Sequence, residues 1–396
     1  DTLAGGSAAI MIGAGFGEVE DEKAKDLERS LRKVIDEAGD EGCVVGPNGM
    51  GVATDEYDAT FAREAGIETS QESSIALISQ SGVVFSQAAS SLTLRNTKVR
   101  YAISIGNAMD LKAADYLEYI LKYEDEIKVV AMYLEDDGGE RLVRLIYEAG
   151  KRGVFVIICK GATTTKGIQA AKSHTGSKAS EFKSFKEVLE HAGAIVFSDL
   201  DDEELMPDVV YAANYFAAKG MPQGNRAYGF GLGGADIVFM TDAEAASDGF
   251  EFLQPDEGLA GFIKGLGLAN DVKTPQDLTA AAGIEHIKAI LGYLDKTPGQ
   301  FDLILFAYLP WLTGPGDAER LAQIVRARDR GTLPVVFAIK DYSDQGMRVK
   351  DHMRKAGLLV IGTPRRAVFS LSAILKSRKY NAAQMHPASV NRSAGP

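Results

Sequence analysis

The sequence predicts an α/β protein whose parallel sheets are covered by helices on both faces. Two observations indicate this fold class. Short apolar runs alternate with amphipathic stretches along nearly the whole chain, and this strand-then-helix order is typical of parallel sheets. The chain has 396 residues, 45% of them hydrophobic, which is enough for two or three domains that each bury a core.

The first predicted domain, residues 1–71, is the C-terminal part of a Rossmann-like domain. Its elements are a strand at residues 8–12, a charged helix at 20–38, a strand at 43–45 and a turn at 46–51. The chain lacks an initiating Met and enters a strand almost at once. We therefore expect that truncation or cleavage has removed the start of this domain.

The second predicted domain, residues 72–218, carries a five-stranded flavodoxin-like sheet. Its strands are the apolar runs at residues 75–78, 99–104, 129–134, 154–160 and 194–197, which helical stretches separate. A helix at residues 203–218 ends the domain.

A turn-rich linker at residues 219–224 leads to a third predicted domain, residues 225–380, where the same alternation starts again. Its predicted strands are residues 227–230, 303–306, 333–339 and 358–361. We expect a second flavodoxin-like domain here. Residues 381–396 have few core residues and are expected to form a tail or a linker.

Charge and cysteine content exclude several classes of protein. A net charge of −12 disfavours a nucleic-acid surface, which needs clustered Lys and Arg. Cys43 and Cys159 provide neither a disulfide framework nor a paired-Cys zinc spacing, so we expect a cytoplasmic protein without a metal site. No apolar stretch has the length of a membrane span, and the N-terminal residues lack a signal-peptide pattern.

Two strand-to-helix turns are candidate phosphate sites, because ligands of open parallel sheets bind beyond the carboxyl ends of strands. Ser79-Gln80-Ser81-Gly82 follows the strand at 75–78, and its two hydroxyls, backbone N–H groups and helix dipole are predicted to point at one spot. Gly231-Leu232-Gly233-Gly234 follows the strand at 227–230 in the same way. Each turn could also be an ordinary tight connection, since short glycine motifs are common.

A candidate nucleophile lies in residues 161–180, which are predicted to form a long loop of small and polar residues around Ser173-His174-Thr175-Gly176. Neutral imidazole is nucleophilic near physiological pH, so a mobile His174 could accept and surrender a phosphoryl group. Glu135, directly after the strand at 129–134, could hold the ring in one tautomer. The alternatives are a solvated surface histidine and a solvated carboxylate.

The other histidines and the single tryptophan have plainer interpretations. His191, His286, His352 and His386 lie in helical or tail contexts without a ligand cluster, so we expect them to be structural or exposed. Trp311 is expected in core packing or a domain contact, with a pocket mouth as the alternative. Neither Ser79 nor Ser81 lies in a Gly-x-Ser-x-Gly elbow, which disfavours a hydrolase.

These motifs, in their order, resemble the CoA-binding subunit of the succinyl-CoA synthetase superfamily, and most closely its ADP-forming acetyl-CoA synthetase branch. The resemblance covers nearly the whole chain. The matching segments are Gly46-Pro47-Asn48 with Gly51, Ser79-Gln80-Ser81-Gly82, Ser104-Ile105-Gly106-Asn107 with Asp110, residues 115–119, Leu134-Glu135 and Ser173-His174-Thr175-Gly176.

The resemblance implies an acid–thiol ligase that forms acyl-CoA from a carboxylic acid, CoA and ATP through an acyl phosphate and a phosphohistidine. It implies that His174 carries the phosphoryl group and that Glu135 orients its ring. The implied binding residues are Ser79, Gln80, Ser81, Gly82, Gly231, Gly233 and Gly234 for phosphate, Gly15, Phe16, Gly46, Pro47 and Asn48 for CoA, and Gly106 and Asn107 for substrate. ATP or ADP with Mg would bind an ATP-grasp unit, in a partner subunit or in missing C-terminal domains, and we expect an oligomer.

The chain also departs from the family pattern. Gly49 stands where relatives usually have Cys or Thr, Thr274 replaces an Asn and Ser180 replaces a glycine. Asp236 follows the second glycine turn, and we expect its carboxylate to point away because it would otherwise repel a phosphate.

Two further hypotheses stay open at this point, a CoA- or acyl-CoA-binding regulatory module without turnover and a flavin-binding flavodoxin relative. A flavin protein would be yellow when purified. The sequence leaves the identity of the acid and the choice between ATP and GTP undecided.

Overall fold

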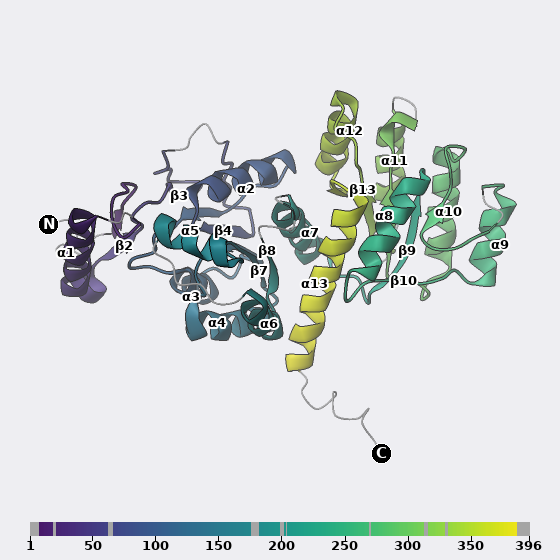
Figure 1. Ribbon diagram of the computed structural model, residues 1–396. Coiled ribbons are helices and arrows are strands. Elements are labelled where there is room, and N and C mark those ends of the chain that lie inside the picture. The colour runs from purple at the N-terminus through teal and green to yellow at the C-terminus, as the bar shows by residue number, and fades with distance from the viewer. Residues whose placement is uncertain are drawn as a thin grey trace, which may run out of the picture. The chain divides into compact units, whose positions relative to one another are not determined.

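The computed structural model describes residues 8–18, 21–61, 66–175, 182–198, 202, 204–268, 271–312, 316–328 and 332–385, without the side chains of residues 40, 171–175 and 382–385. The described chain divides into two compact units (Figure 1). Unit 1 is Asp1–Val210 with Ser377–Pro396, and unit 2 is Tyr211–Lys376.

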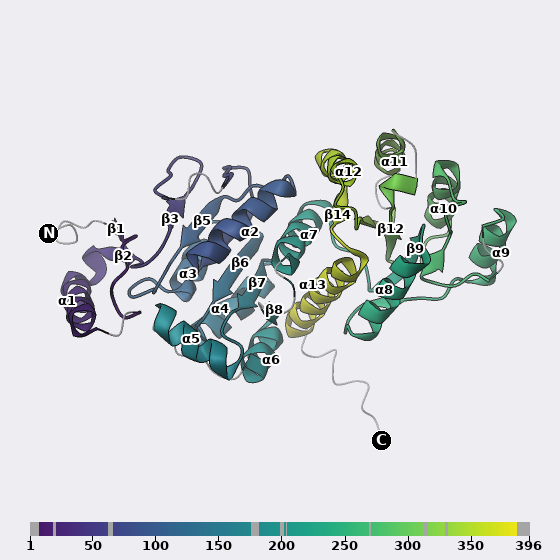
Figure 2. The same cartoon turned by 45° about the horizontal axis from the view of Figure 1, so that its top comes forward.

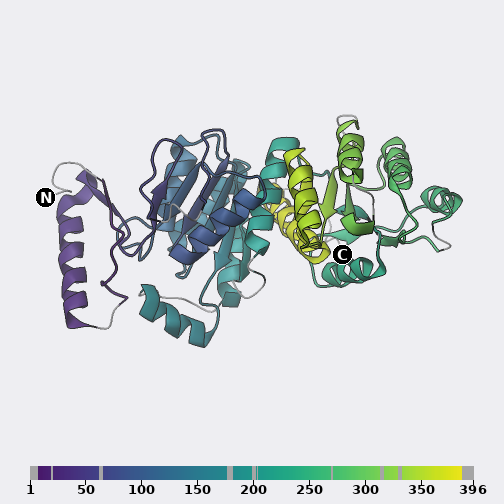
Figure 3. The same cartoon turned by 90° about the horizontal axis from the view of Figure 1, so that it is seen from above.

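A small two-stranded parallel sheet begins unit 1. Strand β1 (Ala8–Ile10) pairs with β2 (Cys43–Val45), and helix α1 (Glu22–Ala38), the purple helix in Figure 3, connects them. The short 3-10 helix η2 (Gly39–Glu41) follows α1. The predicted strand–helix–strand order is confirmed, although the first strand ends at Ile10 instead of residue 12.

The main sheet of unit 1 has six strands, one more than predicted. The strands are β3 (Gly51–Ala53), β4 (Ile75–Ser79), β5 (Tyr101–Ser104), β6 (Val129–Leu134), β7 (Phe155–Lys160) and β8 (Ile195–Ser198). Their order is β3-β5-β4-β6-β7-β8, and the last five are parallel in the flavodoxin-like order 2-1-3-4-5. The extra strand β3 lies within the predicted first domain, residues 1–71, but joins this sheet antiparallel to β5.

Helices cover both faces of this sheet. Helices α3 (Ala113–Tyr123), α4 (Gly139–Lys151) and α6 (Phe182–Ala192) bury their apolar sides with alternate strand residues in one core. Helix α2 (Gly82–Leu94) lies on the opposite face (Figure 2). Helix α7 (Leu205–Lys219) then crosses from unit 1 into unit 2. In the sheet of unit 1, the strand order switches between β4 and β6, because β5 lies on one side of β4 and the later strands lie on the other. Ligands of such sheets bind beyond the carboxyl ends of the two strands at the switch.

Unit 2 has the same architecture, as predicted. Its parallel strands are β9 (Arg226–Gly231), β10 (Glu251–Phe252), β11 (Gln276–Asp277), β12 (Leu303–Ala307), β13 (Val335–Ala338) and β14 (Leu359–Ile361). The order β10-β9-β12-β13-β14 is again flavodoxin-like, with the two-residue β11 also beside β9. The very short β10 and β11 are additions to the predicted set.

One face of this sheet shares a core with α9 (Glu257–Gly265), α10 (Ile284–Lys296), α11 (Asp317–Arg326) and α12 (Asp344–Lys355). Helix α8 (Gly234–Ala245) follows β9, and the short η4 (Pro310–Leu312) follows β12. Helix α13 (Pro364–Met385) continues five residues into the segment predicted as a tail. Within the described chain, every helix is too short or too polar to cross a bilayer.

Candidate functional site

The first candidate site is the turn between β4 and α2. Ser79 Oγ donates a 2.7 Å hydrogen bond to the carbonyl oxygen of Ser81, and Ser81 Oγ accepts one from Val84 N at 3.4 Å. Both serine side chains are buried, and these hydrogen bonds fix the turn. The sequence had instead predicted that the two hydroxyls point together at a ligand. The N–H groups of Gly82 and Val83 remain as the donors that begin the helix.

Gln80 differs from its predicted role as a phosphate ligand. Its side-chain Nε2 donates to Asp136 Oδ2 at 2.8 Å, and its Oε1 accepts from the backbone N–H groups of Glu135 and Asp136 at 2.5 and 3.2 Å. The backbone N–H of Gln80 donates to Tyr133 O at 3.1 Å. Gln80 thus ties the residues that follow β6 to the end of β4.

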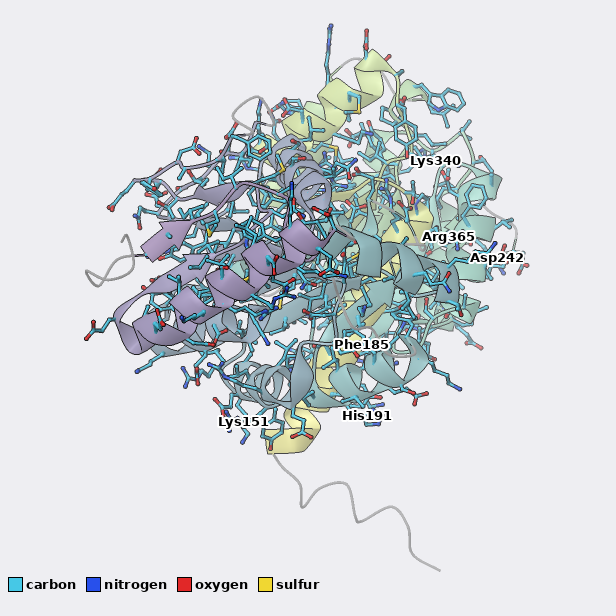
Figure 4. All side chains as sticks on the ribbon, turned by 60° about the vertical axis from the view of Figure 1, so that its left-hand side comes forward. Lys151, Phe185, His191, Asp242, Lys340 and Arg365 are labelled. Carbon is cyan, nitrogen blue, oxygen red and sulfur yellow. The ribbon has the colours of Figure 1, made fainter. Side chains whose placement is uncertain are left out.

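Lys160, the last residue of β7, supports the same segment and was not singled out from the sequence. Its side chain is 1% exposed, and Nζ donates to the carbonyl oxygens of Glu135 at 2.7 Å and Gly161 at 2.9 Å. Nζ also lies 5.3 Å from the ring centroid of Phe185, labelled in Figure 4. The available signal was a Lys closing an otherwise apolar strand.

Glu135 is consequently fixed on both sides of its peptide chain. Gln80 holds its N–H from β4, and Lys160 holds its carbonyl oxygen from β7. The residue is 5% exposed. These bonds fix the backbone of Glu135 at the switch point of the parallel sheet, and a carboxylate carried by a fixed backbone is suited to orienting a reactive group.

The segment predicted as a loop around His174 is helical in its first part. Helix α5 spans Thr165–Thr175, so the prediction of a loop over residues 161–180 is wrong for these positions. Thr164 begins the helix, because its Oγ1 accepts from Gly167 N at 3.0 Å. His174 lies near the end of α5, and its side chain is outside the described residues.

The predicted CoA turn and the predicted substrate residues lie together. Asn48 Nδ2 donates to Asn107 Oδ1 at 3.2 Å, and Asn107 N donates to Pro47 O at 2.9 Å. Gly46 and Gly106 have positive φ angles of 103° and 53°. A Cβ on Gly106 would lie 2.1 Å from Pro47 O, so this approach requires glycine.

Glu18 is a further residue of this cluster that the sequence did not reveal. Its Oε1 accepts from the N–H groups of Gly15 at 2.5 Å and Phe16 at 3.2 Å, and its Oε2 accepts from Asn107 Nδ2 at 2.6 Å. Partial burial raises the pKa of Glu18, but hydrogen bonds from Gly15, its own N–H, Asn107 and Phe16 outweigh this and lower it overall. The N–H groups of Gly15 and Phe16, which the sequence assigned to CoA, thus bind a carboxylate of the chain itself.

The fold gives a steric reason for glycine at position 49. A Cβ at this position would lie 2.6 Å from the carbonyl oxygen of Ser104, which is the last residue of β5. The Cys or Thr of relatives would therefore require the turn to move away from β5.

The second candidate phosphate site, in unit 2, is lined by carboxylates. Gly233 caps α8 and Gly234 begins it, and both follow Gly231 at the end of β9. Asp277 Oδ2 would lie 3.2 Å from a Cβ on Gly234, and Asp236 Oδ2 would lie 4.0 Å from one on Gly233. Asp236 was predicted to point away from this turn, and the structure buries its side chain at the helix start.

The charges around Asp236 affect its protonation. Burial raises the pKa of its carboxyl group, Lys340 partly offsets this, and the negative charge of Asp277 adds to it. Lys340 follows β13, and its Nζ lies 4.7 Å from the ring centroid of Phe239 (Figure 4 labels Lys340). A phosphate at this helix start would have to approach two carboxylates and one lysine.

The remaining predicted residues are not gathered into a site. Trp311 is 65% exposed in η4, so the expectation of core packing is wrong. His191 and His352 lie on exposed positions of α6 and α12, His286 is half-buried on α10, and His386 lies outside the described residues. Within the described part of the chain, no cluster of three or more His, Cys, Asp or Glu could hold a metal ion. Cys43 and Cys159 are both thiols.

Comparison with known proteins agrees with this fold. Residues 72–210 match the succinyl-CoA ligase-like flavodoxin domain. The chain is 26% identical to the alpha subunit of ADP-forming acetate–CoA ligase II of Pyrococcus furiosus, over 95% of this chain and 79% of the relative. It is 28% identical to ADP-forming acetate–CoA ligase I of Archaeoglobus fulgidus, over 94% of this chain but only 51% of the relative.

A solved structure shares the fold as a whole. The dinucleotide-forming acetyl-coenzyme A synthetase 1 of Candidatus Korarchaeum cryptofilum, in complex with phosphate and ADP, superposes with a TM-score of 0.80 at 23% identity. The match covers 97% of this chain and 80% of that one. Residues 72–210 thus match a succinyl-CoA ligase-like domain, and the chain over nearly its whole length is similar to alpha subunits of ADP-forming acetate–CoA ligases.

Proposed function

We propose that the chain is the CoA-binding and phosphohistidine part of a cytoplasmic acid–thiol ligase that forms acyl-CoA from a carboxylic acid, CoA and ATP. The observation that carries this proposal is the doubly held peptide of Glu135 beside the start of α2, at the switch point of the sheet. Similarity to acyl-CoA ligases supports it, and these relatives are named as ADP-forming.

The proposed chemistry is phosphoryl transfer through His174. A nucleotide-binding unit passes the γ-phosphoryl group of ATP to an imidazole nitrogen of His174 and keeps ADP. A carboxylate oxygen of the acid attacks the phosphorus, the P–N bond breaks, and an acyl phosphate and neutral imidazole result. The CoA thiolate then attacks the acyl carbon, inorganic phosphate leaves, and every step is reversible.

The residues of unit 1 have distinct parts in this proposal. Glu135 orients the imidazole, and the N–H groups at the start of α2 bind the phosphoryl oxygens through the positive end of the helix dipole. The turn of Gly46, Pro47 and Asn48 holds CoA, and the neighbouring Gly106 and Asn107 contact the carboxyl end of the acid. ATP and Mg bind an ATP-grasp unit, for which the alpha-subunit names of the relatives suggest a partner subunit.

Mass spectrometry for acid-labile phosphate tests the proposal. The chain is incubated with a nucleotide-binding partner of the family and with ATP or GTP, and we expect one phosphoryl group on His174. His174→Ala should abolish labelling and turnover while leaving cooperative unfolding intact, because the change removes only the proposed nucleophile. His191→Ala, a matched change on the exposed side of α6, should leave labelling unchanged. Labelling that persists in His174→Ala would refute the assignment.

A second candidate function is a CoA-binding regulatory module without turnover. Two observations favour it: Asp236 and Asp277 lie at the α8 start, and Glu18 occupies the N–H groups of Gly15 and Phe16. Under this function the chain binds CoA in equilibrium dialysis, while His174 stays unphosphorylated with every nucleotide and partner tested. Phosphorylation of His174 excludes it.

A further inference from the structure

Unit 1 contains a cavity of about 590 Å³ on the face of the sheet that α2 covers. Side chains of α2 and of the start of α7 form its walls, and Tyr133 of β6 and Cys159 of β7 also line it. Sites for small molecules commonly have volumes of about 300–1,000 Å³. The cavity is therefore large enough for an organic ligand and lies within one unit of the chain.

The cavity lies close to the edge of the sheet that carries Glu135, and its described lining begins at Val84 on α2. Tyr133 is the next-to-last residue of β6 and Cys159 is the next-to-last residue of β7, so both lie one residue before the carboxyl ends of their strands. The hydroxyl of Tyr133 would lie 2.2 Å from a Cβ on Gly161, the first residue after β7. At the other wall, Val84 belongs to the first turn of α2. A ligand in the cavity could therefore extend to the α2 start.

The lining chemistry restricts the charge of that ligand. Asp202 and Glu204 line the cavity, and its described lining residues include no Lys or Arg. Arg95 lies next to it but is 4% exposed and bound to Glu204 at 2.7 Å and Asp208 at 2.8 Å. One arginine thus faces three carboxylates, so a second carboxylate on the ligand would meet net negative charge.

The remaining walls favour an apolar body. Val84, Ala88 and Leu94 contribute apolar surface from α2, and Met206 and Pro207 contribute it from α7. Tyr133 adds an aromatic ring and Cys159 a polarisable thiol. The methyl group of acetate would fill only a small part of this space and would gain little from burial.

We infer that this cavity receives the acyl body of the acid, and that the acid is a monocarboxylate with an uncharged aryl or branched body, not acetate or a dicarboxylate. This inference rests on the proposed function, since it places the reacting carboxylate at the α2 start and the acyl body below it. The specificity-determining residues are Ala88 and Cys159, which limit the volume, and Asp202, which excludes a second charge.

Thiol footprinting of Cys159 tests the inference on the full chain. Cys43→Ser leaves Cys159 as the single thiol, and its rate of reaction with an aromatic disulfide is measured with phenylacetate, acetate or succinate present. We expect phenylacetate at about ten times its Kd to slow the reaction by about 10-fold, because the thiol then reacts only in the small unliganded fraction. Acetate and succinate should leave the rate nearly unchanged.

Two variants make the test specific. Ala88→Leu fills the cavity from α2 and should remove protection by phenylacetate. Asp202→Asn, which keeps the side-chain oxygen that accepts from Glu204 N, should let an acid with a second carboxylate begin to protect. Equal protection by all three acids, or none by phenylacetate, overturns the inference.

The outcome is separable from that of the proposed function. If His174 is phosphorylated by ATP and partner but phenylacetate gives no protection, the ligase function stands and the cavity assignment fails. If phenylacetate protects Cys159 while His174 stays unphosphorylated, the cavity binds the acid but the proposed reaction fails.

Discussion

Lys160 Nζ donates a 2.7 Å hydrogen bond to the carbonyl oxygen of Glu135, from a side chain that is almost entirely buried. A lysine is seldom buried, because its ammonium group loses hydration that protein acceptors must replace. Here the carbonyl oxygens of Glu135 and Gly161 supply that replacement. With Gln80 on the N–H side, the peptide of Glu135 is fixed from three neighbouring strands, β4, β6 and β7.

Lys160→Met should therefore impair both stability and phosphoryl transfer. The methionine cannot donate, so two buried carbonyl oxygens lose a partner, which costs about 1–3 kcal/mol of unfolding free energy. The loosened Glu135 should slow phosphorylation of His174 by at least about 10-fold. Urea unfolding and the phosphohistidine formation rate measure the two effects.

Lys151→Met is the matched control for this change. Lys151 is an exposed residue at the end of α4, where its Nζ lies 4.1 Å from the ring centroid of Tyr147 (Figure 4). This variant should change the unfolding free energy by less than about 0.5 kcal/mol and leave the phosphorylation rate intact. An unimpaired rate in Lys160→Met would show that Glu135 needs no support from β7.

The ionised carboxylate of Glu18 should stabilise the fold at pH values above the ordinary pKa of a glutamate. Its folded pKa is lowered, so the stabilisation is present above the unfolded pKa of about 4.3 and is lost as the pH falls through the folded value. Glu18→Gln should cost about 1 kcal/mol at pH 7, because an amide binds the N–H groups of Gly15 and Phe16 more weakly than a carboxylate does.

Unfolding free energies at several pH values check the role of Glu18. The difference in unfolding free energy between the natural chain and Glu18→Gln should stay constant from about pH 6 to 8 and shrink towards about pH 3. This range follows from the ordinary Glu pKa of about 4.3, below which the carboxylate of the natural chain becomes protonated. Glu28→Gln is a suitable control, since Glu28 lies on α1 and pairs with Arg32. A difference that grows with acidification would contradict the sign of the pKa change.

Sequence patterns predicted the sheets because their strands are continuous apolar runs. Residues 129–134, for example, have no polar interruption and are buried along their whole length, as in β6. The three residues of β3 gave no such signal, and only pairing with the distant β5 makes them a strand. Helix α5 was missed because its small and polar residues suggested a loop, although Thr164 provides a helix cap.

The candidate site was predictable only in outline. Turns after strands are visible in the sequence, which is why the positions of Ser79 and Glu135 were found. Which side chains turn inward depends on contacts between distant segments, and nothing near Lys160 or Gln80 indicates that both hold the peptide of Glu135. The closeness of Asp277 to Gly234 arises in the same way from the pairing of β11 with β9.

Asp236→Asn should become more stable than the natural chain as the pH rises. The folded pKa of Asp236 is raised, so the stabilisation from its protonated form is present below the unfolded pKa and is lost as the pH rises through the folded value. Asparagine resembles the protonated carboxyl group at every pH, so the stability of the variant relative to the natural chain should increase as the pH rises above the ordinary Asp pKa of about 3.9.

Unfolding free energies across this pH range, and phosphate affinity by isothermal titration, test the role of Asp236. Removing one of the two carboxylates at the α8 start should also raise phosphate affinity at neutral pH. Asp242→Asn, on the same helix beyond its first turn, should show neither effect (Figure 4 labels Asp242). If Asp236→Asn instead lost stability relative to the natural chain as the pH rises, the attraction of Lys340 for the Asp236 carboxylate would outweigh the effect of burial.

Gly49→Ala should destabilise the chain, whereas Gly13→Ala should not. The added Cβ at residue 49 would lie 2.6 Å from Ser104 O, and backbone atoms on both sides leave little room to yield, so we expect a cost of about 1–3 kcal/mol. No atom described by the structure lies within 4 Å of a Cβ on Gly13, where alanine should be neutral or slightly stabilising. Chemical denaturation of both variants measures the difference. A neutral Gly49→Ala would mean that the turn moves readily away from β5, and that the Cys or Thr of relatives could be accommodated here.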